Sequence, residues 1–441
     1  MRVAFATLGC RLNQFETDAL VRAAGEAGHE VVDFADAADL YVVNSCTITH
    51  DADADTRQLV RRAARRAELL TDGRTPRARV VVTGCMANAD PDALAAMPEV
   101  SRVLGNREKE RFFDLALGTG DERVHVAAAD LGRRVRLARL RPAADPRRSR
   151  AYLKIQDGCD YRCSFCIVPQ VRGRSSSLPP AEVALQLREI VAAGVPEVVL
   201  TGVHLGTYGR DLRPRSDLAG LLRALVPELG AARLRLGSVD PHEVSDELIE
   251  QLAGDRRLCR HLHLPVQSGD DDVLRAMRRA HTVADLRALV PRLAAAVPGI
   301  HLGTDVIAGF PGESVAQFEA TVDLLAGLPL ASLHVFSYSE RRGTAAASLP
   351  DPVHPAVRLA RTRALRVVSE RLSLTFRRGQ LGARVPAVVY RARDRRSGSL
   401  VALTDNYIKV RLDGADALLG RAIELQIDAV DGDDTRGRLV V

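Results

Sequence analysis

Residues 151–166 read AYLKIQDGCDYRCSFC and place three cysteines on one tight loop, directly after an apolar run that predicts a strand. The thiols of Cys159, Cys163 and Cys166 are separated by three and by two residues. Iron–sulfur clusters are held by cysteine thiolates and commonly take several of them from one such run. A cubane cluster has four irons, so three local ligands would leave one iron open. A structural zinc site is the weaker alternative, because it usually needs four protein ligands.

Outward from this loop, residues 151 to about 345 alternate strand-like and helix-like segments. Six segments predict strands, and they read AYLKIQ, EVVLTGV, RLRLGS, HLHLPV, LGTDVIAG and SLHVFSY. Six βα units are too few for a closed eight-stranded barrel of roughly 250 residues, so we expect a partial (β/α)6 barrel. Polar and glycine-rich motifs follow the strands, and the active sites of such barrels lie in these loops. We assign residues 151–376 to this barrel, including a connecting helix that begins at Pro355.

Residues 1–127 also alternate strands and helices, which predicts an α/β domain with a doubly wound parallel sheet. Three of its predicted strands run directly into a cysteine: RVAFATLG into Cys10, DLYVVNS into Cys46 and ARVVVTG into Cys85. Ligands of open α/β sheets bind beyond the carboxyl ends of the strands, so the three thiols can converge on one site. Three separate buried core thiols are the alternative.

Two further segments complete the predicted organisation. Residues 128–150 break the periodicity and carry eight arginines, which favours a solvated linker, with an RNA-contacting segment as the alternative. Residues 377–441 contain short strand-like runs and predict a small all-β barrel of the kind that often binds RNA. In this barrel Tyr407, Lys409 and Arg411 are candidates for stacking on a base and pairing with phosphates, and exposed strand positions are the alternative.

Composition limits the remaining possibilities. The net charge of +6 says little about partners, because only three of the 62 basic residues are lysines, an imbalance typical of a GC-rich genome. Seven cysteines are an odd number in a chain without the features of a secretory signal, which argues against a disulfide framework. Apolar runs stay well below about 18 residues, so we expect no membrane span and a cytoplasmic location.

The cysteine loop, with Phe165 before its last cysteine, resembles the signature of radical S-adenosylmethionine (SAM) enzymes. Across nearly the whole chain, TLGCRLNQFE, VVNSCTIT, VVTGCMA, KIQDGCDYRCSFCIVPQVRGR, HLPVQSG and TDVIAGFPGE are similar to the methylthiotransferase family. This resemblance implies that the open iron binds SAM, whose reductive cleavage yields methionine and a 5′-deoxyadenosyl radical. It also implies a second 4Fe–4S cluster on Cys10, Cys46 and Cys85 that carries or donates sulfur. The C-terminal domain is similar to the family's RNA-binding TRAM module.

The resemblance further implies SAM or substrate contacts at the ends of the barrel strands. Besides Phe165, the candidates are Thr201 and Gly202 after the second strand, Ser238 and Asp240 after the third, and Gln267 and Ser268 after the fourth. Loop capping is the alternative for these residues. We expect His261 and His263 to form a hydrogen-bonded core pair, and Cys259 to be a small buried side chain.

The stretches TLGCRLNQFETDAL, LTGVHLGTYG and LHVFSYSERRGTAA look most like the branch that acts on N6-threonylcarbamoyladenosine next to the tRNA anticodon. The isopentenyladenosine branch and the branch that modifies a ribosomal-protein aspartate are the alternatives. Threonylcarbamoyl carries a carboxylate, for which Arg341 and Arg342 are the nearest cationic candidates. After Arg174 the chain reads SSSLPP, where the family tends to be more basic, and this departure weakens the case for RNA contact there.

The implied partners are tRNA, a flavodoxin- or ferredoxin-like electron donor and a sulfur source. A protein of a different class stays open as well: an iron–sulfur protein that binds RNA or senses redox state without turnover. The polar loops after all six barrel strands argue against this alternative. Loops at that end of a barrel form active sites, which a protein without turnover does not need.

Overall fold

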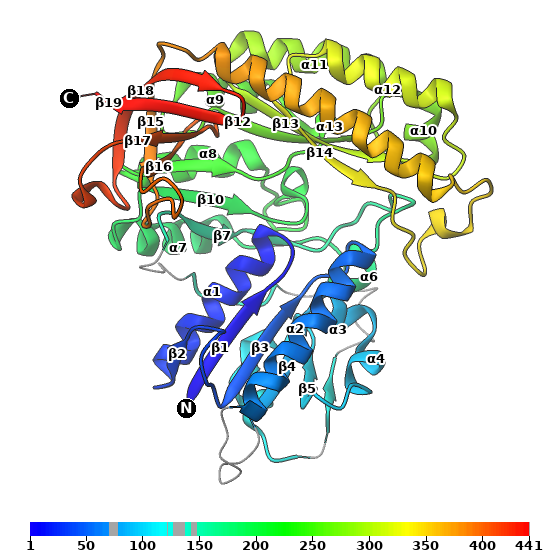
Figure 1. Cartoon of the computed structure of the whole chain (residues 1–441), viewed down its shortest axis with the longest axis vertical. Helices are drawn as coiled ribbons and strands as arrows, with labels where there is room; N and C mark the ends of the chain where they lie inside the picture. The colour runs from blue at the N-terminus through cyan, green and yellow to red at the C-terminus, as the bar shows by residue number, and fades with distance from the viewer. Residues whose placement is uncertain (70–77, 121, 127–136, 143–147, 441) are drawn as a thin grey trace.

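The computed structural model describes residues 1–69, 78–120, 122–126, 137–142 and 148–440. Figure 1 shows the N-terminal α/β part at the bottom, a larger barrel-like sheet above it, and a small closed barrel (red) at one end of the latter. The predicted fold class is confirmed in all three parts. Residues 128–136 and 143–147 of the expected linker lie outside the described residues. In the described part of the chain, we find no helix long and apolar enough to cross a membrane.

The N-terminal sheet has six described strands, all parallel, in the order β2-β1-β3-β4-β5-β6. Apolar side chains fill both of its faces: α2 packs on one through Val60, and α1 and α5 pack on the other through Leu20 and Phe112. The sheet is therefore doubly wound, and the chain changes direction between β1 and β3. The strands are β1 (Arg2–Thr7), β2 (Glu30–Val32), β3 (Leu40–Ser45), β4 (Arg79–Gly84), β5 (Arg102–Leu104) and β6 (Val124–His125). The helices are α1 (Arg11–Glu26), α2 (His50–Leu69), α3 (Cys85–Ala89), α4 (Pro91–Ala95) and α5 (Phe112–Leu117).

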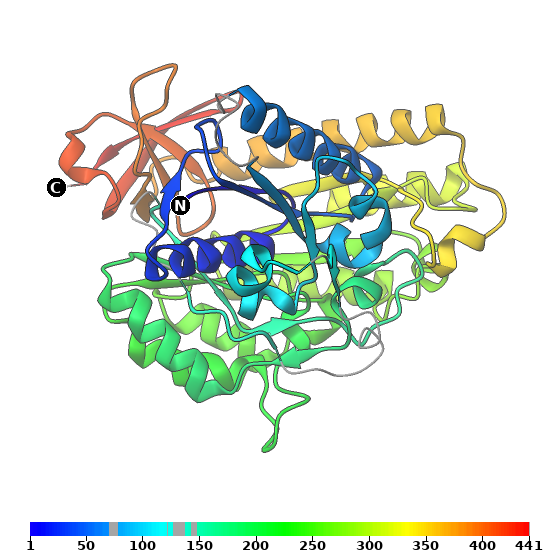
Figure 2. The same cartoon turned by 90° about the horizontal axis from the view of Figure 1, so that it is seen from below.

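The larger barrel is open and contains the six predicted parallel strands. Two three-stranded sheets meet through bridges between Leu234 and Leu258 and between Ser238 and His263. The strands are β7 (Ala151–Lys154), β10 (Glu197–Thr201), β11 (Arg233–Leu236), β12 (His261–Gln267), β13 (His301–Ala308) and β14 (Ser332–Ser337). The covering helices are α7 (Pro180–Ala192), α8 (Leu218–Leu225), α9 (Asp246–Gly254), α10 (Asp271–Ala276), α11 (Val283–Ala296) and α12 (Val315–Gly327). Figure 2 shows α1 and α2 of the N-terminal part lying across this barrel.

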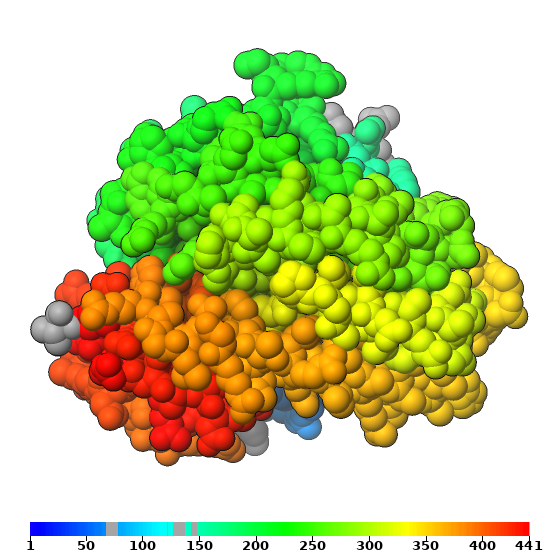
Figure 3. Space-filling model, turned by 90° about the horizontal axis from the view of Figure 1, so that it is seen from above, coloured from blue at the N-terminus to red at the C-terminus, as the bar shows by residue number. Residues whose placement is uncertain are grey.

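The long helix α13 (Pro355–Arg378) leads from the larger barrel to the small one. It packs on β14 and α12 through Leu365, Val368 and Leu372, as its apolar spacing predicts. Figure 3 shows this helix (orange) between the barrel helices and the small barrel. The small barrel closes in the order β15-β16-β17-β19-β18. Its strands are β15 (Arg384–Val389), β16 (Leu400–Thr404), β17 (Lys409–Leu412), β18 (Ala422–Asp431) and β19 (Asp434–Leu439).

The turn between β16 and β17 inserts into the amino-terminal end of the larger barrel. Arg233 donates to Leu403 O (2.8 Å) and Arg235 to Asp405 O (2.8 Å), and both arginines also pair with buried Glu197. The Tyr407 ring lies tilted against that of His261, with the ring centroids 4.5 Å apart. Tyr407 is therefore committed to this contact, and its predicted role as a stacking face for a base is wrong.

Three other predictions about single residues have clear outcomes. Cys259 is buried, as expected. His261 and His263 do not bond each other: His261 packs against the ring of His301, and His263 Nε2 lies 3.0 Å from Asp305 Oδ1. Both histidines are buried, as expected, but the expectation of a mutual hydrogen bond is wrong. Residues two apart on a strand share a face yet lie about 6.6 Å apart, and each imidazole contacts the neighbouring strand β13 instead.

Candidate active site

Cys10, Cys46 and Cys85 lie at the carboxyl ends of three neighbouring strands. Cys10 precedes α1, Cys46 follows β3 directly, and Cys85 begins α3 directly after β4. The strands β1 and β3 flank the point where the strand order reverses, which is the usual ligand site of such sheets. A Cβ at Gly9, where φ is +91°, would lie 2.9 Å from Cys46 Sγ, so this close approach requires glycine. The structure thus brings these three cysteines to one edge, with Cys46 and Cys85 buried and Cys10 exposed.

Cys159, Cys163 and Cys166 lie on the loop between β8 (Gln156–Asp157) and α6 (Val168–Arg172). Backbone hydrogen bonds shape this loop: Cys159 N donates to Gly173 O (3.0 Å) and Cys166 N donates to Cys163 O (3.1 Å). All three side chains are partly exposed. Three soft sulfur donors on one ordered loop fit the ligation of an iron–sulfur cluster.

The thiols themselves show what iron binding would require. Burial raises the pKa of Cys85 to about 11 and that of Cys166 to about 12, and it also raises the pKa of Cys46. Metal ligation needs thiolates, so an incoming metal must displace these protons. The donor sets therefore fit a metal that binds sulfur strongly.

Two positively polarised groups contact the thiols of the barrel loop. His204 Nδ1 lies 3.4 Å from Cys159 Sγ, and Arg279 Nη1 lies 3.5 Å from Cys163 Sγ. The other imidazole nitrogen, Nε2, lies 2.6 Å from Glu243 and 3.2 Å from Asp240. Burial alone would lower the pKa of this imidazole, but hydrogen bonds with Asp240, Cys159 and Glu243 raise it to about 12. Hydrogen bonds to cluster sulfurs tune a cluster's reduction potential, which is a role these two side chains fit.

The sequence indicated only part of this arrangement. Asp240, a candidate for contact with SAM or substrate, lies between His204 and Arg279 and forms ion pairs with both. The stretch LTGVHLGTYG contains His204, and Glu243 lies in the polar motif SVDPHE (residues 238–243) that follows the third barrel strand. For Arg279 no motif gave a signal.

A cavity of about 190 Å³ adjoins the barrel cysteines at the seam between the two α/β parts. Its walls include Phe165, Cys166 and Gln267 from the barrel, and Ile48 and Thr49 from the segment after Cys46. Two of the predicted SAM contacts therefore share a cavity with residues next to both cysteine groups. The other candidates do not line it; they are Thr201, Gly202, Ser238, Asp240 and Ser268.

A buried polar network connects the two cysteine groups. Glu16 of α1 accepts hydrogen bonds from Arg172 (2.9 Å) and Lys154 (3.1 Å) of the barrel and from Lys109 of the N-terminal part. Arg172 also donates to Asn13 Oδ1 (2.6 Å). Burial alone would raise the pKa of Glu16, but the three cations hold it well below its usual range.

Asn13 extends this network to the N-terminal cysteine group, which consists of Cys10, Cys46 and Cys85. Its amide donates to Leu8 O (2.8 Å) and Ser45 O (2.9 Å), which lie beside Cys10 and Cys46. Arg172 ends the helix that follows Cys166. One set of buried contacts thus fixes the backbone on both sides of the seam, and sequence reasoning did not predict it.

Comparison with known proteins agrees with this geometry. The profile of the Radical SAM superfamily matches residues 153–325, and that of Uncharacterized protein family UPF0004 matches residues 2–105. The chain resembles solved radical SAM proteins in fold. The methyltransferase TsrM from Kitasatospora setae, solved with cobalamin and a [4Fe-4S] cluster bound, aligns over 76% of this chain and 74% of its own with a TM-score of 0.54 and 18% identity. The fold and the barrel loop define a radical SAM enzyme.

Two curated relatives narrow the family. The threonylcarbamoyladenosine tRNA methylthiotransferase MtaB of Bacillus subtilis (strain 168) is 36% identical over 96% of this chain and 93% of its own. The tRNA-2-methylthio-N(6)-dimethylallyladenosine synthase of Syntrophotalea carbinolica is 32% identical over 96% of this chain and 95% of its own. This chain belongs to the radical SAM methylthiotransferase family. Membership implies SAM and a 4Fe–4S cluster as cofactors.

Proposed function

We propose that this chain is a tRNA methylthiotransferase that adds a methylthio group at C2 of N6-threonylcarbamoyladenosine next to the anticodon. The observation that carries the proposal is the pair of cysteine groups, each with three thiols, on opposite sides of one seam. Replacing an aromatic C–H bond by C–S needs an oxidant stronger than any side chain, together with a sulfur source.

Two 4Fe–4S clusters are part of the proposal. Cys159, Cys163 and Cys166 would hold the cluster that binds SAM, and Cys10, Cys46 and Cys85 would hold the second. The seventh cysteine, Cys259, lies near Glu197 in the ion-pair cluster at the amino-terminal end of the barrel. It is therefore not placed to be a fourth ligand, which leaves three cysteine ligands for each cluster. Each cluster would keep one iron free, for SAM in one case and for sulfur in the other.

When bound, SAM and its cluster supply the radical that removes hydrogen from the substrate. The protein positions the reactants. Phe165 and Gln267 line the cavity where we place SAM, and Ile48 and Thr49 close it from the side of the second group. His204 and Arg279 place side-chain nitrogens within hydrogen-bonding distance of the sulfurs of Cys159 and Cys163. Reductive cleavage consumes an electron, for which a flavodoxin- or ferredoxin-like donor is needed, and each product contains new sulfur, for which a sulfur source is needed. The methyl group of the product would come from a second molecule of SAM, which is a methyl donor.

A second cavity at the seam supports the threonylcarbamoyl substrate. It measures about 620 Å³, and its walls include four cations and two carboxylates: Arg57, Arg162, Arg341, Arg342, Asp53 and Asp90. Arg341 is buried and donates to Thr47 (2.7 Å) and Asp53 (2.7 Å), while its Nε and Nη1 have no partner among the described residues. Such a wall matches the carboxylate of threonylcarbamoyl better than an apolar isopentenyl group, which would leave buried donors unpaired.

The deciding experiment offers the enzyme two tRNAs that differ only in the N6 group of the adenosine. We expect 2-methylthio product from the threonylcarbamoyl form only, measured by mass spectrometry of the nucleosides. Product from the isopentenyl form alone would refute the substrate assignment and leave the reaction class intact. Modification of a ribosomal protein, with neither tRNA reacting, would refute the RNA substrate.

A further inference from the structure

We propose that an acidic one-electron carrier protein docks beside the barrel cysteine loop, against Tyr161 and the segment that joins β10 to α8. This inference rests on the proposed function, in which the cluster of the barrel loop is reduced before SAM is cleaved, and it assigns the surface through which the electron arrives. The carrier is oxidised by one electron and the cluster is reduced by one, so the step needs no further reactant. We call this surface the carrier patch, and its residues are Tyr161, Arg174, Arg210, Arg213, Arg215 and His242.

A chain of side-chain contacts leads from the carrier patch to the thiol of Cys159. His242 is exposed, and its Nε2 lies 2.8 Å from the hydroxyl of Tyr161. The ring of Tyr161 lies tilted against that of His204, with the ring centroids 4.7 Å apart. His204 Nδ1 in turn lies 3.4 Å from Cys159 Sγ. Two aromatic side chains therefore separate an exposed imidazole from a thiol that we expect to bind iron.

The carrier patch is separate from the two cavities that we assign to SAM and to the substrate. The walls of these cavities include Cys166 and Ile167 of the barrel loop, together with residues of the N-terminal part. They include no residue of the carrier patch. SAM must already be bound when the electron that cleaves it arrives, so the carrier has to dock without filling either cavity. The carrier patch meets this condition.

The arginines of the carrier patch are exposed. Arg174 and Arg210 expose 48% and 55% of their side chains. Arg213 and Arg215 follow Arg210 on the segment between β10 and α8, and both are exposed. Arg213 Nη1 donates to Leu212 O (2.8 Å), a contact within this segment that leaves its charge unpaired by a carboxylate among the described residues. These cations are therefore available to a partner.

The carboxylates of the same segments are engaged within the protein. Glu243 is 2% exposed, and Asp160 pairs with Arg174 at 3.0 Å. Asp211 and Asp217 accept hydrogen bonds from backbone N–H groups. The exposed charge of the carrier patch is mainly positive, and such a surface speeds the encounter with an anionic partner. Electron-transfer complexes are weak and bury less than about 1,200 Å², so a small patch of this kind suffices.

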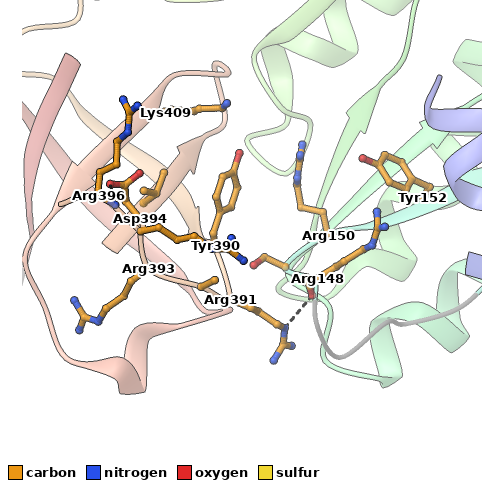
Figure 4. Close-up of a pocket in the computed structure, with 13 residues that line it drawn as sticks. Arg148, Arg150, Tyr152, Tyr390, Arg391, Arg393, Asp394, Arg396 and Lys409 are labelled. Atoms are coloured by element: carbon orange, nitrogen blue, oxygen red, sulfur yellow. Dashed lines mark hydrogen bonds between the residues drawn. The ribbon is translucent and has the colours of Figure 1, made fainter. Parts of the chain in front are cut away.

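A second group of exposed cations provides a control surface. Figure 4 shows a cavity between β7 and the small barrel, and its lining residues include Arg395 and Arg396. Both are exposed, as Arg213 and Arg215 are. The walls of this cavity contain no cysteine and no residue of the carrier patch. Reversing two charges there changes the net charge equally and leaves the carrier patch intact.

The test reverses two charges of the carrier patch in the variant R213E/R215E. Binding of a bacterial flavodoxin and, in parallel, of a ferredoxin to the reconstituted enzyme is measured by isothermal titration calorimetry at several salt concentrations. We expect the dissociation constant of the bound carrier to rise at least about fivefold, and its dependence on salt to weaken. The control R395E/R396E should bind the carrier as the wild type does. SAM cleavage driven by dithionite should be equal in all three proteins, whereas cleavage driven by the reduced carrier should need more carrier in R213E/R215E.

A further variant, R213K/R215K, keeps the charges and should bind the carrier nearly as tightly as the wild type, which separates charge from folding of the segment. Unchanged carrier binding in R213E/R215E would overturn the inference, as would an equal loss in R395E/R396E, because the overall field would then decide. Weaker binding of tRNA in R213E/R215E, with carrier binding unchanged, would also overturn it, since the patch would then hold the substrate. If the wild type cleaves no SAM even with dithionite, the proposed function fails instead.

Discussion

Glu16→Gln tests the buried network at the seam. The side chains of Glu16 and Lys109 are 1% and 0% exposed, and Lys154 and Arg172 complete the group of cations around the carboxylate. Glutamine keeps the shape of the side chain and removes its charge. Lys154 and Arg172 would then keep the partly exposed carboxylate of Asp157 as a partner, whereas Lys109 would keep only the amide oxygens of two asparagines.

Removing one partner of a buried pair typically lowers the free energy of unfolding by about 3 to 5 kcal/mol, because the opposite charge is left without compensation. We expect a loss in this range for Glu16→Gln, measured by urea denaturation of the iron-free protein near neutral pH. Near neutral pH, Glu16 is ionised in both the folded and the unfolded chain. Its pKa is lowered by folding, so its ionised carboxylate stabilises the fold above the unfolded pKa of about 4.5. This stabilisation is lost only as the pH falls below that value.

Glu197→Gln provides the matched control. Glu197 is equally buried and pairs with Arg233 and Arg235, at the opposite end of the barrel strands from the cysteines. We expect both variants to lose stability, but only Glu16→Gln to reduce the iron bound by Cys10, Cys46 and Cys85. That iron is counted in a background where the three barrel cysteines are alanine. A loss below about 1 kcal/mol for Glu16→Gln, or equal iron retention in both variants, would refute the reasoning.

Two further outcomes follow from the site and from a buried histidine. Anaerobically reconstituted protein should bind about eight irons. Alanine at Cys159, Cys163 and Cys166 should halve that number and abolish SAM cleavage. Alanine at Cys10, Cys46 and Cys85 should also halve the iron content but leave some SAM cleavage. Full activity of the wild type with about four irons would contradict the presence of two clusters. Burial, aided by the charge of Arg279, lowers the pKa of His281 from 6.5 to about 4. His281 therefore contributes stability above pH 6.5 that is lost as the pH falls from 6.5 to 4, by up to about 3 kcal/mol. His281→Gln should flatten the dependence of unfolding free energy on pH in this window, and a parallel curve would contradict the assignment.

The sequence predicted the features that depend on neighbours along the chain. Cys10, Cys46 and Cys85 each follow a strand of a parallel sheet, and parallel strands present their carboxyl ends at one edge, so their convergence followed from order alone. The six barrel strands were recognisable in the same way, because β-branched and leucine-rich runs alternate with amphipathic helices.

Contacts between distant segments could not be predicted in this way. Glu16 and Arg172 are 156 residues apart, and nothing in their local sequence marks them as partners. Tyr407 lies in a polar turn that resembles an exposed RNA-binding position, but tertiary contacts place it against His261. Arg341 was a candidate ligand for the substrate, and its contacts with Asp53 and Thr47, through a single nitrogen, could not be read from its local sequence.

The insertion of the β16–β17 turn has a consequence for how the protein is made. Tyr407 accepts a hydrogen bond from Arg11 (3.0 Å), and Arg11 is the residue directly after Cys10. A ribosome synthesises Cys10 almost four hundred residues before it reaches Tyr407. The first cysteine group therefore acquires its complete surroundings only when the chain is nearly finished. During translation, the N-terminal part would emerge with the thiol of Cys10 exposed, while Arg11 beside it still lacks its hydrogen-bond partner Tyr407.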